Sequence, residues 1–227
     1  MPLIRLPNAK MLYFTHVPKC AGTSVEDYLR DRFGLLGLLD RRFGKRSAPE
    51  AWTHSPPQHM PEAVRAELLP DTLFNGIFAT VRHPATRLRS VSVFQRAVEC
   101  SIPANTSFPV WVEALPRMLA TDPYALHGHL RPMSETVPLD ANVFRIEQGL
   151  ADLIDWLDEI AGDAGGPRKI GRANITAERM RGTMQQVQLN KAVLGRIATI
   201  YAADYARFGY DLGPPPSPRS PKTEPSS

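Results

Sequence analysis

Cysteine is scarce in this sequence, which has only Cys20 and Cys100 among its 227 residues. Two cysteines are too few for the disulfide framework of a small secreted protein. Neither of them lies in the short-spaced ligand pattern that a zinc site requires. This shortage favours a reducing compartment.

Long apolar runs are missing as well. No window approaches the run of about 18 apolar residues that a transmembrane helix needs. Residues 1–14 also lack the apolar core and the small-residue cleavage site of a signal peptide. We therefore expect no integral membrane segment and a cytoplasmic location.

An excess of charge of one sign is also absent, because 27 Lys and Arg face 23 Asp and Glu, for a formal charge of +4. Nucleic-acid binding would be expected to show a denser basic stripe, zinc-finger spacing or an aromatic-rich RNA-binding signature. We therefore expect no nucleic-acid partner, and the lack of an acidic ligand cluster predicts no metal. Most of the basic residues are arginine, whose planar guanidinium suits phosphate and sulfate oxyanions.

The length and the 43% hydrophobic content are enough for one sizeable core. We expect a single domain over residues 1–212. Residues 213–227 are rich in proline and serine, cannot build a core and are predicted to be a disordered tail.

Strand-like and helix-like segments alternate along the chain, which favours an α/β fold with a parallel sheet. Residues 100–140 contain many prolines and are predicted to be mostly loop, with one short helix near Trp111. Residues 45–61 and 162–176 are predicted loops. Apolar runs predict strands within 11–17, 74–81 and 142–146, and amphipathic patterns predict helices over 23–34, 84–99, 147–161 and roughly 184–208.

The stretch "HVPKCAGTSVE" leads from the first predicted strand into a helix. Such a turn aims backbone N–H groups at one point, where the helix dipole adds positive potential, so it can cradle an oxyanion. Gly22 allows close approach of the backbone, Thr23 and Ser24 add hydroxyl groups, and Lys19 adds a mobile cation. The common ATP-binding loop instead places its lysine after the glycine-rich segment.

A second strand-to-helix turn occurs in "ATVRHPATRLRSVSVF". Arg82 directly follows the strand, and Ser90 lies on the helix that begins at Pro84. A guanidinium can bind a phosphate through two hydrogen bonds, and a helical hydroxyl can complete the site. Arg87 is either a further ligand or a structural arginine.

Together these motifs resemble the sulfotransferases that use 3′-phosphoadenosine 5′-phosphosulfate (PAPS). The order P-K-x-x-G-T-S resembles their 5′-phosphosulfate loop, although Cys20 and Ala21 stand where threonine and glycine are common in the family. Arg82 and Ser90 resemble the element of the family that binds the 3′ phosphate. The resemblance implies a P-loop-NTPase-like three-layer fold with a central parallel sheet flanked by helices. It also implies that PAPS is bound by residues 19–24, Arg82 and Ser90, and that sulfate passes to a hydroxyl of a small-molecule or glycan acceptor.

In the branch of this family that includes the heparan 2-O-sulfotransferases, a histidine a little over twenty residues before the strand-ending arginine acts as the catalytic base. His59 precedes Arg82 by 23 residues and His54 by 28, so the resemblance assigns the base to His59, with His54 as the alternate. Lys19 is expected to stabilise the negative charge that develops on the oxygen joining sulfate to phosphate. His129 and Arg131 resemble a cluster near the active site of bacterial members, where they either bind a ligand or pack on the sheet edge.

Two alternative functions stay open at this point. One is a P-loop-type kinase or nucleotide hydrolase, and the other is a non-catalytic nucleotide-binding module. Cys20 is either an acidified, reactive thiol at a helix N-terminus or a small neutral filler. Ala21 would be strained if its position required a positive φ.

Overall fold

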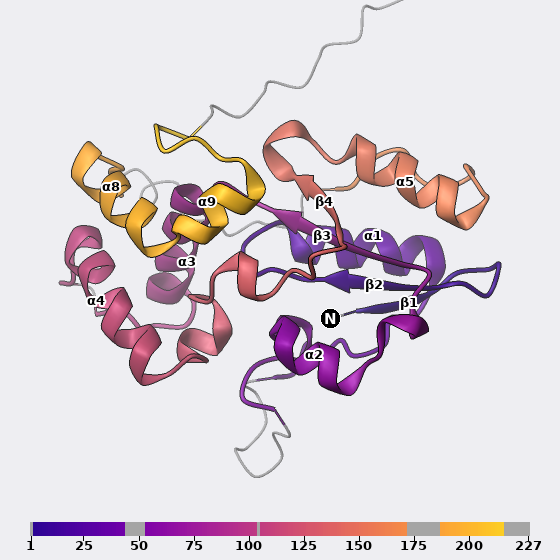
Figure 1. Cartoon of the computed structure of the whole chain (residues 1–227), viewed down its shortest axis with the longest axis horizontal. Helices are drawn as coiled ribbons and strands as arrows, with labels where there is room; N and C mark the ends of the chain where they lie inside the picture. Colours follow the sequence, from indigo (N-terminus) through magenta and orange to yellow (C-terminus); the bar gives the residue numbers. More distant parts are fainter. Residues whose placement is uncertain (1, 44–52, 104, 172–186, 216–227) are drawn as a thin grey trace, which may run out of the picture.

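The computed structural model describes residues 2–43, 53–103, 105–171 and 187–215. Its centre is a four-stranded sheet in the order β1-β2-β3-β4 (Figure 1). The three predicted strands are confirmed, and a fourth, short strand precedes them. The strands are β1 (Leu3–Arg5), β2 (Met11–Thr15), β3 (Gly76–Val81) and β4 (Asn142–Arg145).

The sheet is mixed, so the prediction of a wholly parallel sheet was wrong. Strands β2, β3 and β4 are parallel to one another, whereas β1 pairs antiparallel with β2. The reason is the length of the connection, because only residues 6–10 join β1 to β2 and a parallel pair needs a crossover of a dozen or more residues. A turn closed by a hydrogen bond from Leu6 N to Lys10 O (2.8 Å) makes the hairpin.

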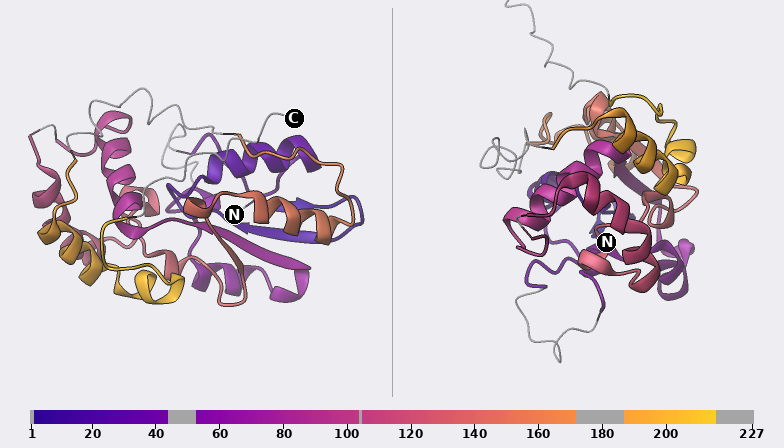
Figure 2. Two further views of the ribbon diagram at one scale, coloured as in Figure 1. Left: turned by 90° about the horizontal axis from the view of Figure 1, so that it is seen from above. Right: turned by 90° about the vertical axis from the view of Figure 1, so that its left-hand side faces the viewer.

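Helices cover both faces of this sheet. Helices α1 (Gly22–Phe33) and α5 (Ala151–Ala161) share a buried cluster with Leu12 and Phe14 of β2. The side chain of Tyr13 points to the other face of the sheet. There it packs with Met60, which precedes α2 (Glu62–Leu68) in the chain. This alternation is the two-residue period of a strand that is buried on both faces. The left-hand view of Figure 2 shows the sheet between these helices.

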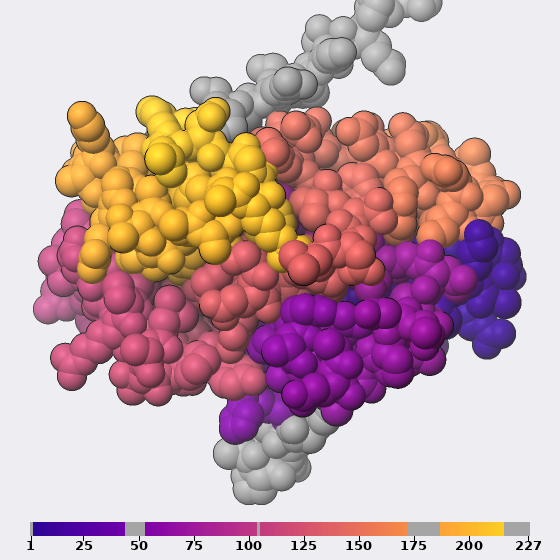
Figure 3. Space-filling view, in the orientation of Figure 1, coloured from indigo at the N-terminus to yellow at the C-terminus, as the bar shows by residue number. Residues whose placement is uncertain are grey.

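Four further helices form a second core beside the sheet: α3 (Pro84–Ala97), α4 (Phe108–Thr121), α8 (Lys191–Ile200) and α9 (Ala202–Phe208). Their cluster includes Leu88, Trp111, Leu115, Ile197 and Tyr201, all nearly inaccessible to solvent. In the space-filling view the C-terminal helices, in yellow, lie next to the segment that contains α4 (Figure 3).

Two helix predictions need correction. Helix α4 has 14 residues and continues through Pro116, so it is longer than the short helix predicted near Trp111. The predicted last helix is two helices that meet at Tyr201. Short 3₁₀ turns complete the described elements: η2 (Pro57–His59), η3 (Asp71–Leu73), η4 (Ala125–Gly128), η5 (Met133–Glu135) and η6 (Ile146–Gln148).

Some predictions fall outside the described residues. Most of the predicted tail (216–227), the start of the predicted last helix (184–186) and parts of the two predicted loops (45–52 and 172–176) are in this category. Within the part of the chain that the structure does describe, no helix combines the length and apolar character needed to cross a membrane.

Candidate functional site

The two strand-to-helix turns predicted from the sequence lie side by side. Because β2 and β3 are parallel neighbours, their carboxyl ends reach the same edge of the sheet. Arg82 Nη1 reaches across and donates to the carbonyl oxygen of Lys19 at 3.4 Å. Just below, Thr80 Oγ1 donates to the carbonyl oxygen of Cys20 at 2.6 Å. The cations of the two motifs are therefore parts of one site.

The backbone of the first turn adopts an unusual conformation. Lys19 has a φ of 66° and Ala21, which is the N-cap of α1, has a φ of 64°. Left-handed residues before a helix curve the chain so that the N–H groups of the turn and of the first helical turn converge. Because Ala21 has a positive φ, the strain expected for an alanine at this position is present. In the left-handed region the Cβ atom crowds the following carbonyl oxygen.

The two cations at this edge, Lys19 and Arg82, are half-buried and are not part of the ion pairs formed among the described residues. Lys19 Nζ lies 4.2 Å from the ring centroid of Phe94. Burial, reinforced by the charge of Arg82, lowers the pKa of Lys19 to about 8. Burial also lowers the pKa of Arg82. A bound anion would relieve both penalties, so the electrostatics favour an anionic ligand.

The remaining predicted cofactor residues differ in accessibility. Thr23 is exposed at the start of α1 and Ser90 is half-buried on α3, so both hydroxyl groups border on solvent. Ser24 is buried.

Gly22 has a further structural role that the sequence did not indicate. A Cβ at this position would lie 2.0 Å from Nε2 of His16, far inside van der Waals contact. The imidazole of His16 therefore occupies the space that a side chain at Gly22 would need. The glycine is required for this packing, whereas its role in the approach of an oxyanion stays a prediction.

Three histidines from separate segments meet beside this turn. The ring centroid of His59 lies 5.0 Å from that of His16 and 5.3 Å from that of His129. His16 follows β2, His59 ends η2 and His129 follows η4. Burial places the pKa values of His59 and His129 well below the ordinary histidine value. Both imidazoles are therefore neutral at pH 7.

The two candidate bases are in different places. His54 is exposed and stacks on Tyr124, with ring centroids 5.2 Å apart. His59 is in the histidine cluster, and its Nδ1 lies 3.4 Å from the carbonyl oxygen of His127. Because a carbonyl oxygen only accepts hydrogen bonds, this contact puts the proton on Nδ1 and leaves Nε2 with a free lone pair.

The two residues of the "HLRP" segment have different environments. His129 is buried, and its Nδ1 accepts a hydrogen bond from Gln95 Nε2 at 3.0 Å. Arg131 is half-buried, forms an ion pair with Glu135 at 2.9 Å and lies 5.2 Å from the ring centroid of Tyr124. Of this pair, only His129 joins the cluster.

Two open alternatives are resolved. Cys20 is fully buried, its Sγ is 3.9 Å from Sδ of Met133, and burial raises its pKa to about 12. The thiol is therefore a small neutral filler, and an acidified, reactive thiol is excluded. Arg87 is also buried and donates to the carbonyl oxygens of Pro18, His129 and Arg131, so it is a structural arginine.

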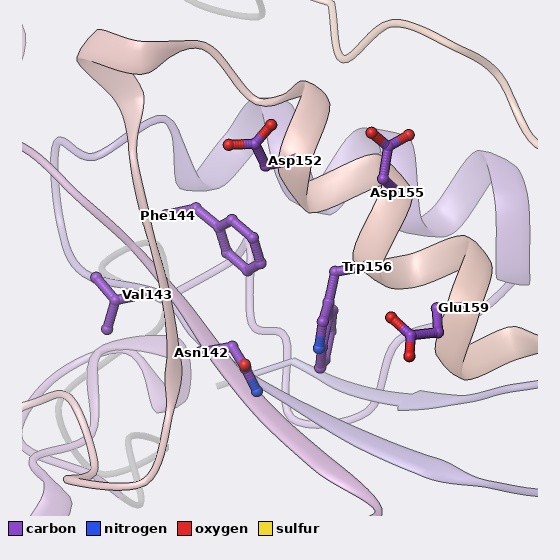
Figure 4. Close-up of a pocket in the computed structure, with 7 residues that line it drawn as sticks. All are labelled: Asn142, Val143, Phe144, Asp152, Asp155, Trp156 and Glu159. Carbon is purple, nitrogen blue, oxygen red and sulfur yellow. The ribbon is translucent and has the colours of Figure 1, made fainter.

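A separate groove of about 400 Å³ lies between β4 and α5 (Figure 4). Its lining includes the carboxylates of Asp152, Asp155 and Glu159 around Trp156. Negative charge of this density disfavours an anionic nucleotide, so the groove does not suit the ligand that the sheet edge favours.

Sequence reasoning missed His16 and its partner Glu26, whose Oε1 lies 2.5 Å from His16 Nδ1. The only available signal was the position of His16 three residues before Lys19.

Among the described residues, no group of three or more His, Cys, Asp or Glu side chains is arranged to hold a metal ion. Comparisons with protein-family models, curated proteins and solved structures found no match for this chain.

Proposed function

We propose that this protein is a sulfotransferase that moves a sulfuryl group from PAPS to a hydroxyl group of a carbohydrate or glycoconjugate. The observation that carries the proposal is the contact between the two turns, in which Arg82 reaches the carbonyl oxygen of Lys19. A nucleotide with anionic groups at both its 5′ and 3′ positions requires two neighbouring cationic sites. The P-loop-like nature of the fold and a cytoplasmic location are parts of the same proposal.

The residues fit such a nucleotide. The left-handed turn, the N-terminus of α1 and Lys19 would hold the 5′ phosphosulfate. Arg82 and the half-buried hydroxyl of Ser90 would hold the 3′ phosphate. The depressed pKa values of Lys19 and Arg82 mean that anion binding also removes an unfavourable interaction from the free protein.

PAPS supplies an activated sulfuryl group. In the transfer, a bond forms between the acceptor oxygen and sulfur, and the bond between sulfur and the bridging oxygen breaks, which releases 3′-phosphoadenosine 5′-phosphate (PAP). The proton of the acceptor hydroxyl goes to Nε2 of His59, which is neutral at pH 7 and carries the free lone pair. Lys19 stabilises the negative charge that develops on the leaving oxygen.

The nucleotide part of the proposal is tested by binding. PAP should raise the melting temperature and bind far more tightly than AMP, because only PAP has a 3′ phosphate. Arg82→Ala should lose roughly 1.5–3 kcal/mol of PAP binding with the fold retained, the value of a hydrogen bond to a charged group. Equal affinity for PAP and AMP would remove the second site from the proposal.

Arg87→Ala, at an arginine on α3 just after Arg82, is the matched comparison. Arg87 holds three carbonyl oxygens inside the protein, so its loss should lower the melting temperature before any effect on the nucleotide is seen. If Arg82→Ala unfolds the protein and Arg87→Ala spares it, the roles assigned to the two arginines are reversed.

The transfer part is tested with radiolabelled PAPS and a panel of carbohydrate and small hydroxyl acceptors. Labelled product is the expected result. Binding of PAP without transfer to any acceptor would favour a non-catalytic nucleotide-binding module. Turnover of ATP with magnesium would favour a kinase or a nucleotide hydrolase.

A further inference from the structure

One buried polar pair beside the site has no role in the steps of the proposed transfer. Glu26 on α1 and His16 after β2 are 3% and 7% exposed, and Oε1 of Glu26 lies 2.5 Å from Nδ1 of His16. The second carboxylate oxygen is 3.8 Å from Nη2 of Arg41. Because a carboxylate only accepts hydrogen bonds, the contact between Glu26 and His16 places a proton on Nδ1 of His16.

The imidazole of His16 is held on three sides. Phe14 stacks on it at 5.8 Å, Gly22 leaves room for its Nε2, and the ring of His59 meets it at 79° with centroids 5.0 Å apart. The pair therefore connects α1, the turn that contains Lys19 and Ala21, and His59, which is the proposed base. Few other orientations of the His16 ring are compatible with these neighbours.

Stability alone is a poor reason for this arrangement. Removing a carboxylate from water is unfavourable, and apolar replacements of buried charged pairs are often neutral or stabilising. Here the pair also requires a glycine at position 22, because any Cβ would collide with the ring. A role in the site explains why a buried polar pair is found here.

We propose that Glu26 and His16 are positioning residues that hold the imidazole of His59 in its working orientation. Glu26 accepts the Nδ1 proton and fixes the orientation and tautomer of His16, and the His16 ring then packs edge-to-face against His59. This inference rests on the proposed function, in which His59 accepts the proton of the acceptor hydroxyl. His16 and Glu26 act through His59 and do not themselves take that proton.

The first test needs no enzymatic activity. Long-range ¹H–¹⁵N NMR of histidine-labelled protein distinguishes protonated from unprotonated ring nitrogens. In the wild type, Nδ1 of His16 should carry a proton. Glu26→Met removes the acceptor at nearly constant length and should shift the ring signals of both His16 and His59. A wild-type His16 without a proton on Nδ1 would overturn the proposal, whether or not the variant folds.

Asp27→Met is the matched control, since it makes the same substitution one residue further along α1. Asp27 is more exposed and pairs with Arg30 and Arg41, so its loss should leave the ring signals of His16 and His59 unchanged. Glu26→Gln keeps an acceptor oxygen and should retain most of the wild-type pattern. Equal shifts in the Glu26→Met and Asp27→Met variants would contradict the proposal.

The second test is kinetic. Glu26→Met should lower kcat roughly 10–100-fold, the usual effect of losing a residue that orients a functional side chain, while PAP affinity stays within a few-fold. Glu26→Gln should recover much of that loss. A fall in PAP affinity equal to the fall in kcat would indicate a purely structural pair. If the wild type transfers sulfate to no acceptor, the proposed function fails, and the NMR comparison still decides whether Glu26 and His16 hold His59.

Discussion

Ala21→Gly tests whether the turn at the site is strained. Ala21 has φ 64° and ψ 15°, which places it in the left-handed region. An L-residue in this left-handed region costs about 1–2 kcal/mol. Glycine removes this strain but gains about 0.4–1 kcal/mol of conformational entropy in the unfolded chain. The net expectation is that Ala21→Gly stabilises the protein by about 1 kcal/mol.

Two other alanines provide matched controls. Ala9 also has a positive φ, 65°, but is exposed in the hairpin at the opposite end of β2. Ala9→Gly should therefore stabilise the protein similarly, without any effect at the site. Ala66 is exposed within helix α2, where the same substitution should destabilise the protein by up to about 1 kcal/mol.

The assay is equilibrium unfolding in urea and by heat, with PAP affinity measured on the same samples. For a domain of this size, 1 kcal/mol corresponds to a melting-temperature shift of roughly 2–4 °C. Ala21→Gly and Ala9→Gly should shift upward and Ala66→Gly downward. A downward shift for Ala21→Gly, equal to that of Ala66→Gly, would show that residue 21 is helical in solution and that the turn is unstrained.

Three further outcomes are expected. Because the pKa of Lys19 is lowered to about 8, the positive charge of Lys19 is present below that pH and lost above it. The affinity for PAP should therefore fall as the pH rises through 8, and Lys19→Arg should remove this pH dependence. Gly22→Ala should destabilise the protein by roughly 1–3 kcal/mol in urea unfolding, since the new Cβ collides with His16. His59→Ala should reduce sulfate transfer roughly 10²–10⁴-fold with PAP affinity kept within a few-fold, whereas His54→Ala should be mild. A reversed order of the two histidine variants would move the base to His54.

Much of the fold could be predicted because it depends on local patterns. The core strands are continuous apolar runs, and Pro84 marks the start of α3 as expected. The hairpin strand β1 was missed because its three residues are too short to show a period. Its antiparallel pairing follows from the short connection to β2, and this made the sheet mixed.

The candidate site divides in the same way. The sequence by itself determined that cations, a glycine and hydroxyl groups follow two core strands, because that information is local to each turn. Tertiary structure decided that β2 and β3 are neighbours, which brings Arg82 to Lys19. It also separated His59 from His54, since their environments depend on segments far away in the chain.

The contacts of His16 could be decided only by the tertiary structure. Nothing in the local pattern of a histidine before Lys19 specifies a contact with Glu26 on the following helix or with His59 in a distant loop. Similarly, spacing cannot show whether an arginine is buried among carbonyl oxygens, as Arg87 is. Local sequence determines which groups each turn offers, whereas burial and long-range packing decide which of them meet, because those depend on the whole chain being folded.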